Sequence, residues 1–141
     1  MSVLNIRASV EELNRVSAFV DEQLEAHDCP FKAQMQIDVA VEEVFVNIAS
    51  YAYAPGDGEA SISVEFPEPG GEGPDRPCVL IRFEDAGVPF DPLAKTDPDV
   101  TLSAEERAVG GLGIFMVKKN MDEVHYVYED GKNILTLCKY L

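Results

Sequence analysis

Apolar and polar side chains alternate without a break from residue 60 to residue 66. This period of two is typical of a β-strand with one buried face and one face in water. A sheet made of such strands needs a covering layer on one side, so we expect the helices of this chain on a single face of its sheet. The apolar set is Ala60, Ile62, Val64 and Phe66, and the polar set is Ser61, Ser63 and Glu65.

Two helical patterns precede this strand. Apolar residues recur at helical intervals from about Val10 to Ala26, just after Ser9, which opens a capping-box spacing. A second helix is predicted from about Phe31 to Tyr53, and the turn residues 55–58 end it. A short strand is expected over residues 3–8, before the first helix.

The alternating strand is followed by a break and a second strand. Residues 67–77 hold four prolines and three glycines, which predicts a loop between two strands. The next strand is expected from Cys78 to Phe83, with a break at Asp85. Residues 90–109 carry Asp-Pro pairs, scattered charge and few large apolar side chains, which is typical of a mobile flap.

The last third of the chain predicts a helix over residues 110–122. A hairpin of strands 124–128 and 134–140 follows, with its turn at Asp130-Gly131. The whole order predicts one domain over residues 1–141. Its fold class is an α/β (α+β) two-layer sandwich, with helices packed on one face of a mixed, mostly antiparallel sheet.

The strongly acidic composition narrows the range of partners. A net charge of −15 and a pI near 4.3 argue against direct nucleic-acid binding, which depends on Lys and Arg neutralising phosphates. No segment resembles a membrane span or an export signal, so a cytoplasmic location is expected. The three cysteines and two histidines lack zinc-site spacing, and we interpret the cysteines as reduced core residues.

Glu43 and Asn47 are the first candidate functional pair. They lie four residues apart, so both project from one helical face, which we expect to point away from the apolar stripe of the helix. An Asn oxygen suits magnesium, and a nearby Glu can orient or deprotonate a hydroxyl for attack on a phosphoryl group. A solvated polar helix face is the alternative interpretation.

Two glycine-containing segments complete the candidate site. Asp85 and Gly87 follow a buried strand, where the carboxylate can accept a hydrogen bond from the amine of adenine and the glycine allows close approach. Gly110, Gly111 and Gly113 open a helix, where backbone N–H groups can face phosphates. An ordinary Asp-x-Gly turn and a flexible hinge are the alternatives. Together the three segments indicate an ATP site.

The order of these segments resembles the ATPase fold shared by gyrase, histidine kinases and MutL, the histidine-kinase-like or Bergerat fold. Three stretches resemble the bacterial anti-sigma-factor serine kinases more narrowly, over about residue 6 to the C-terminus. They are Asp85-Ala86-Gly87-Val88-Pro89-Phe90-Asp91-Pro92, Gly110-Gly111-Leu112-Gly113-Ile114-Phe115-Met116-Val117 and Met121-Asp122-Glu123-Val124.

This resemblance implies a role for each candidate residue. Glu43 would be the catalytic carboxylate, Asn47 the Mg²⁺ ligand, and Asp85 with Gly87 the adenine contact. Thr136 would support that contact through water. Residues 90–109 would form an ATP lid, and the phosphates would be held by the glycine box, which comprises Gly110, Gly111, Leu112 and Gly113.

The resemblance also implies partners and an activity. A typical member uses ATP to phosphorylate a serine of a small anti-anti-sigma (STAS-type) protein, sequesters a sigma factor, and forms a homodimer. Two positions depart from the family pattern: Tyr51, where relatives often have His, and Val109, where many have a basic residue that Arg107 could replace. The hypotheses are therefore a protein serine kinase or a nucleotide-gated binding module without efficient kinase activity. A detached histidine-kinase ATPase subunit and an acidic structural protein are further alternatives.

Overall fold

The computed structural model describes residues 1–54, 56–71, 74–92 and 111–141. Its elements are β1 (Ser2–Arg7), a 3-10 turn η1 (Val10–Glu12), α1 (Leu13–Ala26), α2 (Phe31–Tyr51), β2 (Glu59–Glu65), β3 (Cys78–Asp85), α3 (Gly111–Asn120), β4 (Glu123–Glu129) and β5 (Lys132–Tyr140). The predicted flap lies almost wholly outside the described residues. The predicted loop 67–77 falls in the connection between β2 and β3.

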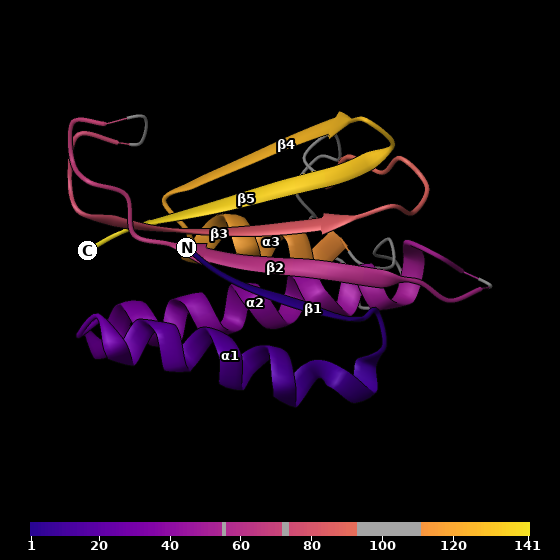
Figure 1. Ribbon diagram of the computed structural model, residues 1–141, viewed down its shortest axis with the longest axis horizontal. Helices are drawn as coiled ribbons and strands as arrows, with labels where there is room; N and C mark the ends of the chain where they lie inside the picture. The colour runs from indigo at the N-terminus through magenta and orange to yellow at the C-terminus, as the bar shows by residue number, and fades with distance from the viewer. Residues whose placement is uncertain (55, 72–73, 93–110) are drawn as a thin grey trace.

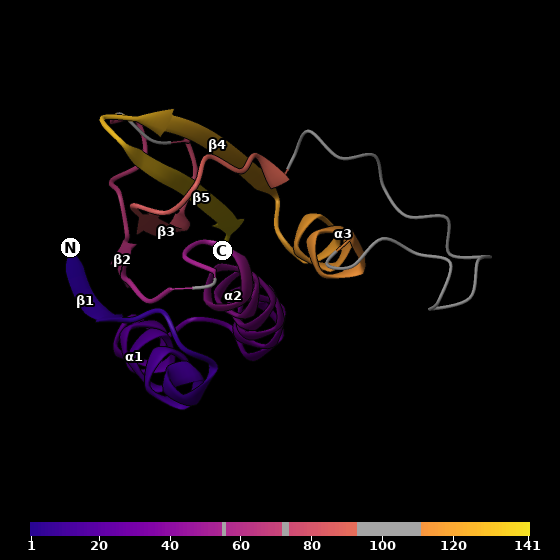
Figure 2. The ribbon, with the colours of Figure 1, turned by 90° about the vertical axis from the view of Figure 1, so that its right-hand side faces the viewer.

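The elements form two layers, as predicted. The strands make one sheet in the order β1-β2-β3-β5-β4, and α1, α2 and α3 cover one of its faces (Figure 1, Figure 2). All four pairings between described strands are antiparallel. The expected sheet was mixed and mostly antiparallel, whereas the described strands pair only in the antiparallel sense. The reason is that hairpins and the return of β5 to β3 bring antiparallel neighbours together.

The alternation in β2 has the structural consequence that the sequence predicts. Ala60, Ile62 and Val64 are buried beneath the helices. Ile62 is paired with Leu4 of β1 and Phe83 of β3. Inward-facing residues of neighbouring strands therefore meet in one core, because side chains at the same register position share a face of the sheet.

The first helix begins later than predicted. The Ser9 hydroxyl accepts a hydrogen bond from the backbone N–H of Glu11 at 3.3 Å, which closes the 3-10 turn, and α1 starts only at Leu13. The turn between β4 and β5 agrees with the prediction. Asp130 and Gly131 both have positive φ, 54° and 77°, as a two-residue type I′ hairpin turn requires.

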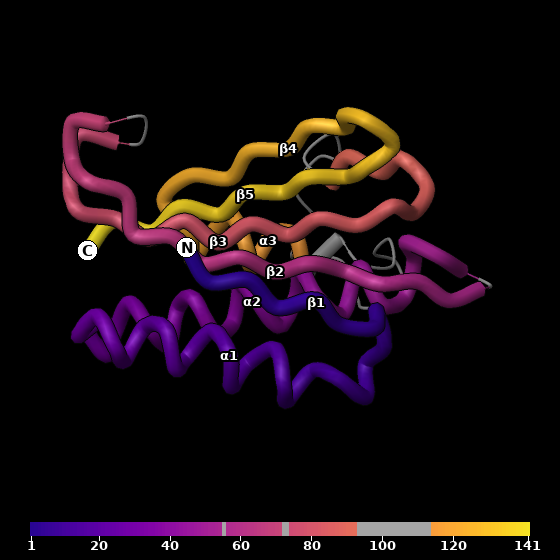
Figure 3. The backbone as a smooth tube through the Cα atoms, in the orientation of Figure 1, coloured from indigo at the N-terminus to yellow at the C-terminus, as the bar shows by residue number. Residues whose placement is uncertain are grey.

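Three structural features meet at one end of the molecule. They are the last residues of α2, the end of β3 at Asp85, and the turn between β4 and β5, all at the right of Figure 3 and opposite the connection between β2 and β3. This end holds the candidate functional site. Within the described segments, no helix is both long enough and apolar enough to span a membrane.

Candidate functional site

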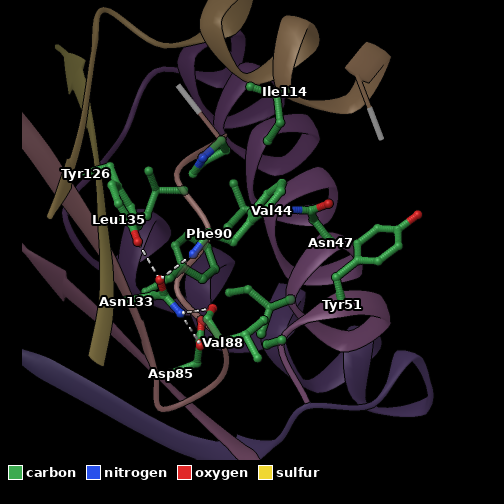
Figure 4. A pocket seen from close by; sticks show the side chains of 14 residues that line it. Val44, Asn47, Tyr51, Asp85, Val88, Phe90, Ile114, Tyr126, Asn133 and Leu135 are labelled. Carbon is green, nitrogen blue, oxygen red and sulfur yellow. Dashed lines mark hydrogen bonds between the residues drawn. The ribbon is translucent and has the colours of Figure 1, made fainter. Parts of the chain in front are cut away.

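A pocket lies between the C-terminal half of α2, the end of β3 and the beginning of α3 (Figure 4). About 550 Å³ of empty space lies within it, a figure that includes open solvent. Its walls are mainly apolar, with several polar groups among them. The apolar residues include Val44, Ile48, Phe83, Val88, Ile114 and Leu135, the carboxylate and amide side chains are those of Asp85, Asn47 and Asn133, and Tyr51 and Tyr126 add phenols.

Asp85 supplies the carboxylate of this pocket. Its side chain is on the inner face of β3, and the residue is only 7% exposed. Oδ1 accepts hydrogen bonds from the backbone N–H of Gly87 at 2.9 Å and from Asn133 Nδ2 at 3.0 Å. Oδ2 has no hydrogen-bond partner among the described residues, so it can accept a hydrogen bond from a ligand.

The loop that follows Asp85 is held by its own backbone donors. Ala86 N–H donates to the Tyr53 hydroxyl, Gly87 N–H to Asp85, Val88 N–H to the Ala52 carbonyl, and Phe90 N–H to Asn133. Residue 89 is proline and has no N–H. No donor of this loop remains for a phosphate, so the loop suits recognition of a ligand group that itself donates.

Asn133, the inward-facing residue near the start of β5, is a site residue that the sequence analysis missed. It is paired with Asp85 in the sheet and is 7% exposed. Its Nδ2 donates to Asp85 and to the Val88 carbonyl at 2.9 Å, while its Oδ1 accepts from Phe90 N–H and the Tyr126 hydroxyl. Both amide hydrogens and both lone pairs are thereby used. Asn133 orients Asp85 and the loop.

Tyr126 completes this polar network from β4. Burial, the largest cause, raises the pKa of its phenol. A hydrogen bond with the Phe90 backbone, the next largest, lowers this pKa, and the negative charges of Asp91 and Asp85 raise it. The hydroxyl therefore stays protonated near neutral pH, and it can keep donating to Asn133.

Thr136 does not reach this pocket, which corrects the expectation for that residue. Its neighbours Leu135 and Leu137 face the helices, so Thr136 faces the opposite side of the sheet, because successive strand residues alternate. There it lines a separate hollow with His125 and other residues of the outer face. Asn133, three residues earlier, has the inward orientation that Thr136 lacks.

Gly87 is required by a close backbone approach. A Cβ atom placed on it would lie 2.2 Å from the carbonyl oxygen of Ala52, far inside van der Waals contact. The same carbonyl accepts the Val88 N–H at 3.0 Å. Gly87 therefore lets the loop after β3 pack directly on the end of α2.

Asn47 and Glu43 have different places on α2. Asn47 is half-buried and lines the pocket beside Val44 and Ile48. It thus shares a wall with apolar residues, whereas the sequence analysis expected it to point away from them. Glu43 is also half-buried, one helical turn from Asn47, and is not among the residues that line the pocket.

The predicted glycine box is described only in part. Gly111, Leu112 and Gly113 form the first turn of α3, and Ile114 in the next position lines the pocket. The amino end of α3 is therefore next to the pocket. Arg107, Val109 and Gly110 lie outside the described residues.

The pocket has the features that a purine base requires. Apolar walls can contact a ring system, and the carboxylate oxygen that has no partner among the described residues can accept a hydrogen bond from an exocyclic amine. No group of three or more His, Cys, Asp or Glu side chains in the described segments could hold a metal ion. Asn47 is compatible with Mg²⁺, which is commonly bound by one or two protein ligands together with substrate phosphates.

The fold and this pocket define a histidine kinase-like ATPase domain. Residues 6–139 match the family described as the histidine kinase-like ATPase domain. The chain belongs to this family. The relatives that it resembles are named serine-protein kinases, the class that its motifs indicated.

Individual relatives agree with this assignment. The serine-protein kinase RsbW of Listeria monocytogenes is 28% identical over 115 residues, which are 79% of this chain and 68% of that protein. The serine/threonine-protein kinase BtrW of Bordetella bronchiseptica is 26% identical over 109 residues, 77% of this chain and 72% of that protein.

A solved structure supports the fold alone. The RsbU and RsbW domains of Rv1364c from Mycobacterium tuberculosis match with a TM-score of 0.61 at 17% identity. The match covers 100% of this chain and 33% of that one, so the present chain is similar to about one third of the larger protein.

Proposed function

We propose that this protein binds ATP in the pocket at Asp85 and transfers its γ-phosphoryl group to a serine of a small anti-anti-sigma partner. The observation that carries the proposal is that Oδ2 of Asp85, in a mainly apolar pocket, has no hydrogen-bond partner among the described residues. That oxygen accepts a hydrogen bond from the adenine amine.

Other residues supply the base, the phosphate-binding N–H groups and a cation. Glu43 orients the serine hydroxyl and takes its proton as the oxygen attacks phosphorus and the bond to ADP breaks. The amino end of α3, with Gly111 and Gly113, presents backbone N–H groups to the phosphates, together with Gly110. Arg107 supplies a cation in place of the basic neighbour that Val109 does not provide.

Asn47 is the residue on the described wall that would hold Mg²⁺. The bound ion would neutralise part of the phosphate charge. Asn47 is suited to this by its half-buried position beside Val44 and Ile48, because a side chain packed in a wall keeps one orientation.

The family assignment supports a proposal about the partners. We propose that the protein exchanges an anti-anti-sigma (STAS-type) substrate for a sigma factor according to nucleotide and phosphorylation state, and that it does so as a cytoplasmic homodimer. Its large negative charge fits regulation through proteins rather than through direct contact with nucleic acid.

Labelled ATP and the cognate serine-containing partner test the kinase proposal. Glu43→Ala should reduce phosphoryl transfer by roughly 10²-fold or more, as expected for loss of a general base, with ATP affinity nearly unchanged. Glu42→Ala is the matched control, because this neighbouring carboxylate is exposed on the same helix. Transfer that is equal in the wild type and Glu43→Ala would exclude the proposed catalytic role.

A nucleotide-gated binding module is the second candidate. It is favoured by Val109, which stands where many relatives have a basic residue. In that case the protein binds ATP and its partner binds differently with and without nucleotide, but no serine becomes labelled. A pull-down with and without ATP, alongside the transfer assay, separates the two functions.

A further inference from the structure

Tyr53 lies two residues beyond the end of α2. Its hydroxyl connects the start of β2 with the loop that follows β3. The hydroxyl donates to the Glu59 carbonyl oxygen at 2.6 Å and accepts from the Ala86 N–H at 2.7 Å. Glu59 begins β2, and Ala86 directly follows Asp85. One phenol oxygen therefore fixes the residue next to the carboxylate of the pocket.

The residue before Tyr53 holds the same loop. The Ala52 carbonyl accepts the Val88 N–H at 3.0 Å. Ala52 and Tyr53 thus secure alternate residues of the loop from the α2 side, while Asn133 secures it from the β5 side. Because these supports come from separate elements, the loop has one position relative to both walls of the pocket.

The Tyr53 ring occupies a space that another glycine leaves open. A Cβ atom on Gly58 would lie 2.4 Å from ring atoms Cε1 and Cζ of Tyr53. Any larger residue at position 58 would displace the ring, because real Cβ contacts are not that short. Gly58 and Tyr53 therefore act as a pair.

We propose that Tyr53 is a positioning residue for nucleotide binding. It is not among the residues that line the pocket at Asp85, and it acts through the Ala86 N–H on the direction of the Asp85 carboxylate. This inference rests on the proposed function of the pocket. Both hydrogen bonds of the hydroxyl are solvent-accessible. Their loss should therefore lower the free energy of unfolding only slightly, and its main consequence should be a change in the position of the loop.

Tyr53→Phe removes only the hydroxyl. We expect calorimetry to show ATP affinity weakened roughly three- to ten-fold, the range for one lost hydrogen bond. The KM for ATP should rise by the same factor, with kcat retained at saturating ATP, because the reacting groups are untouched. Tyr128→Phe is the matched control, since Tyr128 is 45% exposed on β4 and outside the pocket lining.

Gly58→Ala tests the same contact without altering the hydroxyl. It should displace the ring and weaken ATP binding to a similar extent. In a double-mutant cycle, Gly58→Ala combined with Tyr53→Phe should be no worse than the more severe single variant, because both act through one contact. Full additivity would contradict the pairing of ring and glycine.

Amide hydrogen exchange supplies a readout that needs no ATP. In Tyr53→Phe, exchange at residues 86–88 should accelerate, with the thermal midpoint lowered by no more than a few degrees. Unchanged exchange and unchanged ATP affinity in Tyr53→Phe, with affinity lost in Asp85→Asn, would overturn the Tyr53 inference alone. If the wild-type protein bound no ATP, the proposed function would fail and this inference with it.

Discussion

Asp85 and Asp38 are carboxylates in two regions of one fold, and their surroundings differ. Asp85 accepts two hydrogen bonds through Oδ1, and its Oδ2 has no hydrogen-bond partner among the described residues. Asp38, on α2 facing α1, has an Oδ1 that is buried without a hydrogen-bond partner among the described residues. The comparison teaches that burial prepares a carboxylate for a ligand only where donors already orient it.

Asp38 is instead next to other acids. Burial, the largest cause, raises its pKa from 3.8 to about 7, and a hydrogen bond with Asp21 and the charges of Asp21 and Glu25 raise it further. Asp21 also accepts a hydrogen bond from Gln34 at 3.3 Å. The contact between α1 and α2 therefore favours a proton on Asp38, whereas the pocket favours a ligand donor at Asp85.

The largest expected effect is that of Asp85→Asn on nucleotide binding. The amide keeps the shape, but one terminal atom becomes a donor and the negative charge is lost. We expect ATP affinity to fall roughly 10- to 100-fold, the range for a hydrogen bond to a charged group. Calorimetric titration with ATP measures this, and Asp130→Asn is a control because Asp130 is exposed in the turn between β4 and β5 and is not among the residues that line the pocket. Equal affinity for both variants would show that Asp85 does not recognise the base.

Gly87→Ala should have the next largest effect, on stability and on binding together. The added Cβ would collide with the Ala52 carbonyl at 2.2 Å, so the loop must move away from α2. Overpacking of this kind costs about 1–3 kcal/mol, which thermal unfolding should register as a lower midpoint. Gly56→Ala is the control, since its Cβ would find only an ordinary contact at 3.4 Å. Similar midpoints for the two variants would mean that the loop yields easily.

Asp38→Asn should have the smallest effect, visible as pH dependence. The unfolded chain loses this proton near pH 4, whereas the folded protein keeps it to about pH 7. The folded state binds more protons between these values, so the free energy of unfolding falls as pH rises from about 4 to 7. Asn has no proton to lose in this range, so the variant avoids this fall in the free energy of unfolding. The variant's thermal midpoint should exceed the wild-type value by a few degrees at pH 8, with a smaller advantage at pH 5.

Two further results would bear on Asp38. Asp21→Asn should relieve only part of this cost, because it removes the charge of Asp21 but leaves Asp38 buried, and burial is the larger cause. A difference in thermal midpoint that stays constant from pH 5 to pH 8 would show that Asp38 does not hold the proton.

The sequence predicted those parts of the candidate site that lie within one short segment. Asp85 and Gly87 follow a strand whose end is visible in the sequence. Asn47 was found through its spacing from Glu43, but its orientation was wrong because the pocket wall extends further around α2 than the apolar stripe suggested. Helix periodicity places residues on a face, and only packing shows what that face contacts.

Asn133 and Tyr53 could not be found in this way. Each acts on a loop distant in the chain, Asn133 on Asp85 across 48 positions and Tyr53 on Ala86 across 33. A signal for Asn133 did exist, since it continues the inward alternation of Leu135 and Leu137 as an amide. Its meaning depended on the register that pairs it with Asp85.

The sequence by itself determined the two layers, the one-sided helices, the hairpin turn at Asp130-Gly131 and the family, because alternation, helical spacing and glycine-containing motifs are local. The tertiary structure decided which strands are neighbours, and therefore that Asn133 rather than Thr136 faces Asp85. The physical reason is that a strand's parity fixes which residues share a face, while long-range pairing decides what lies opposite each of them.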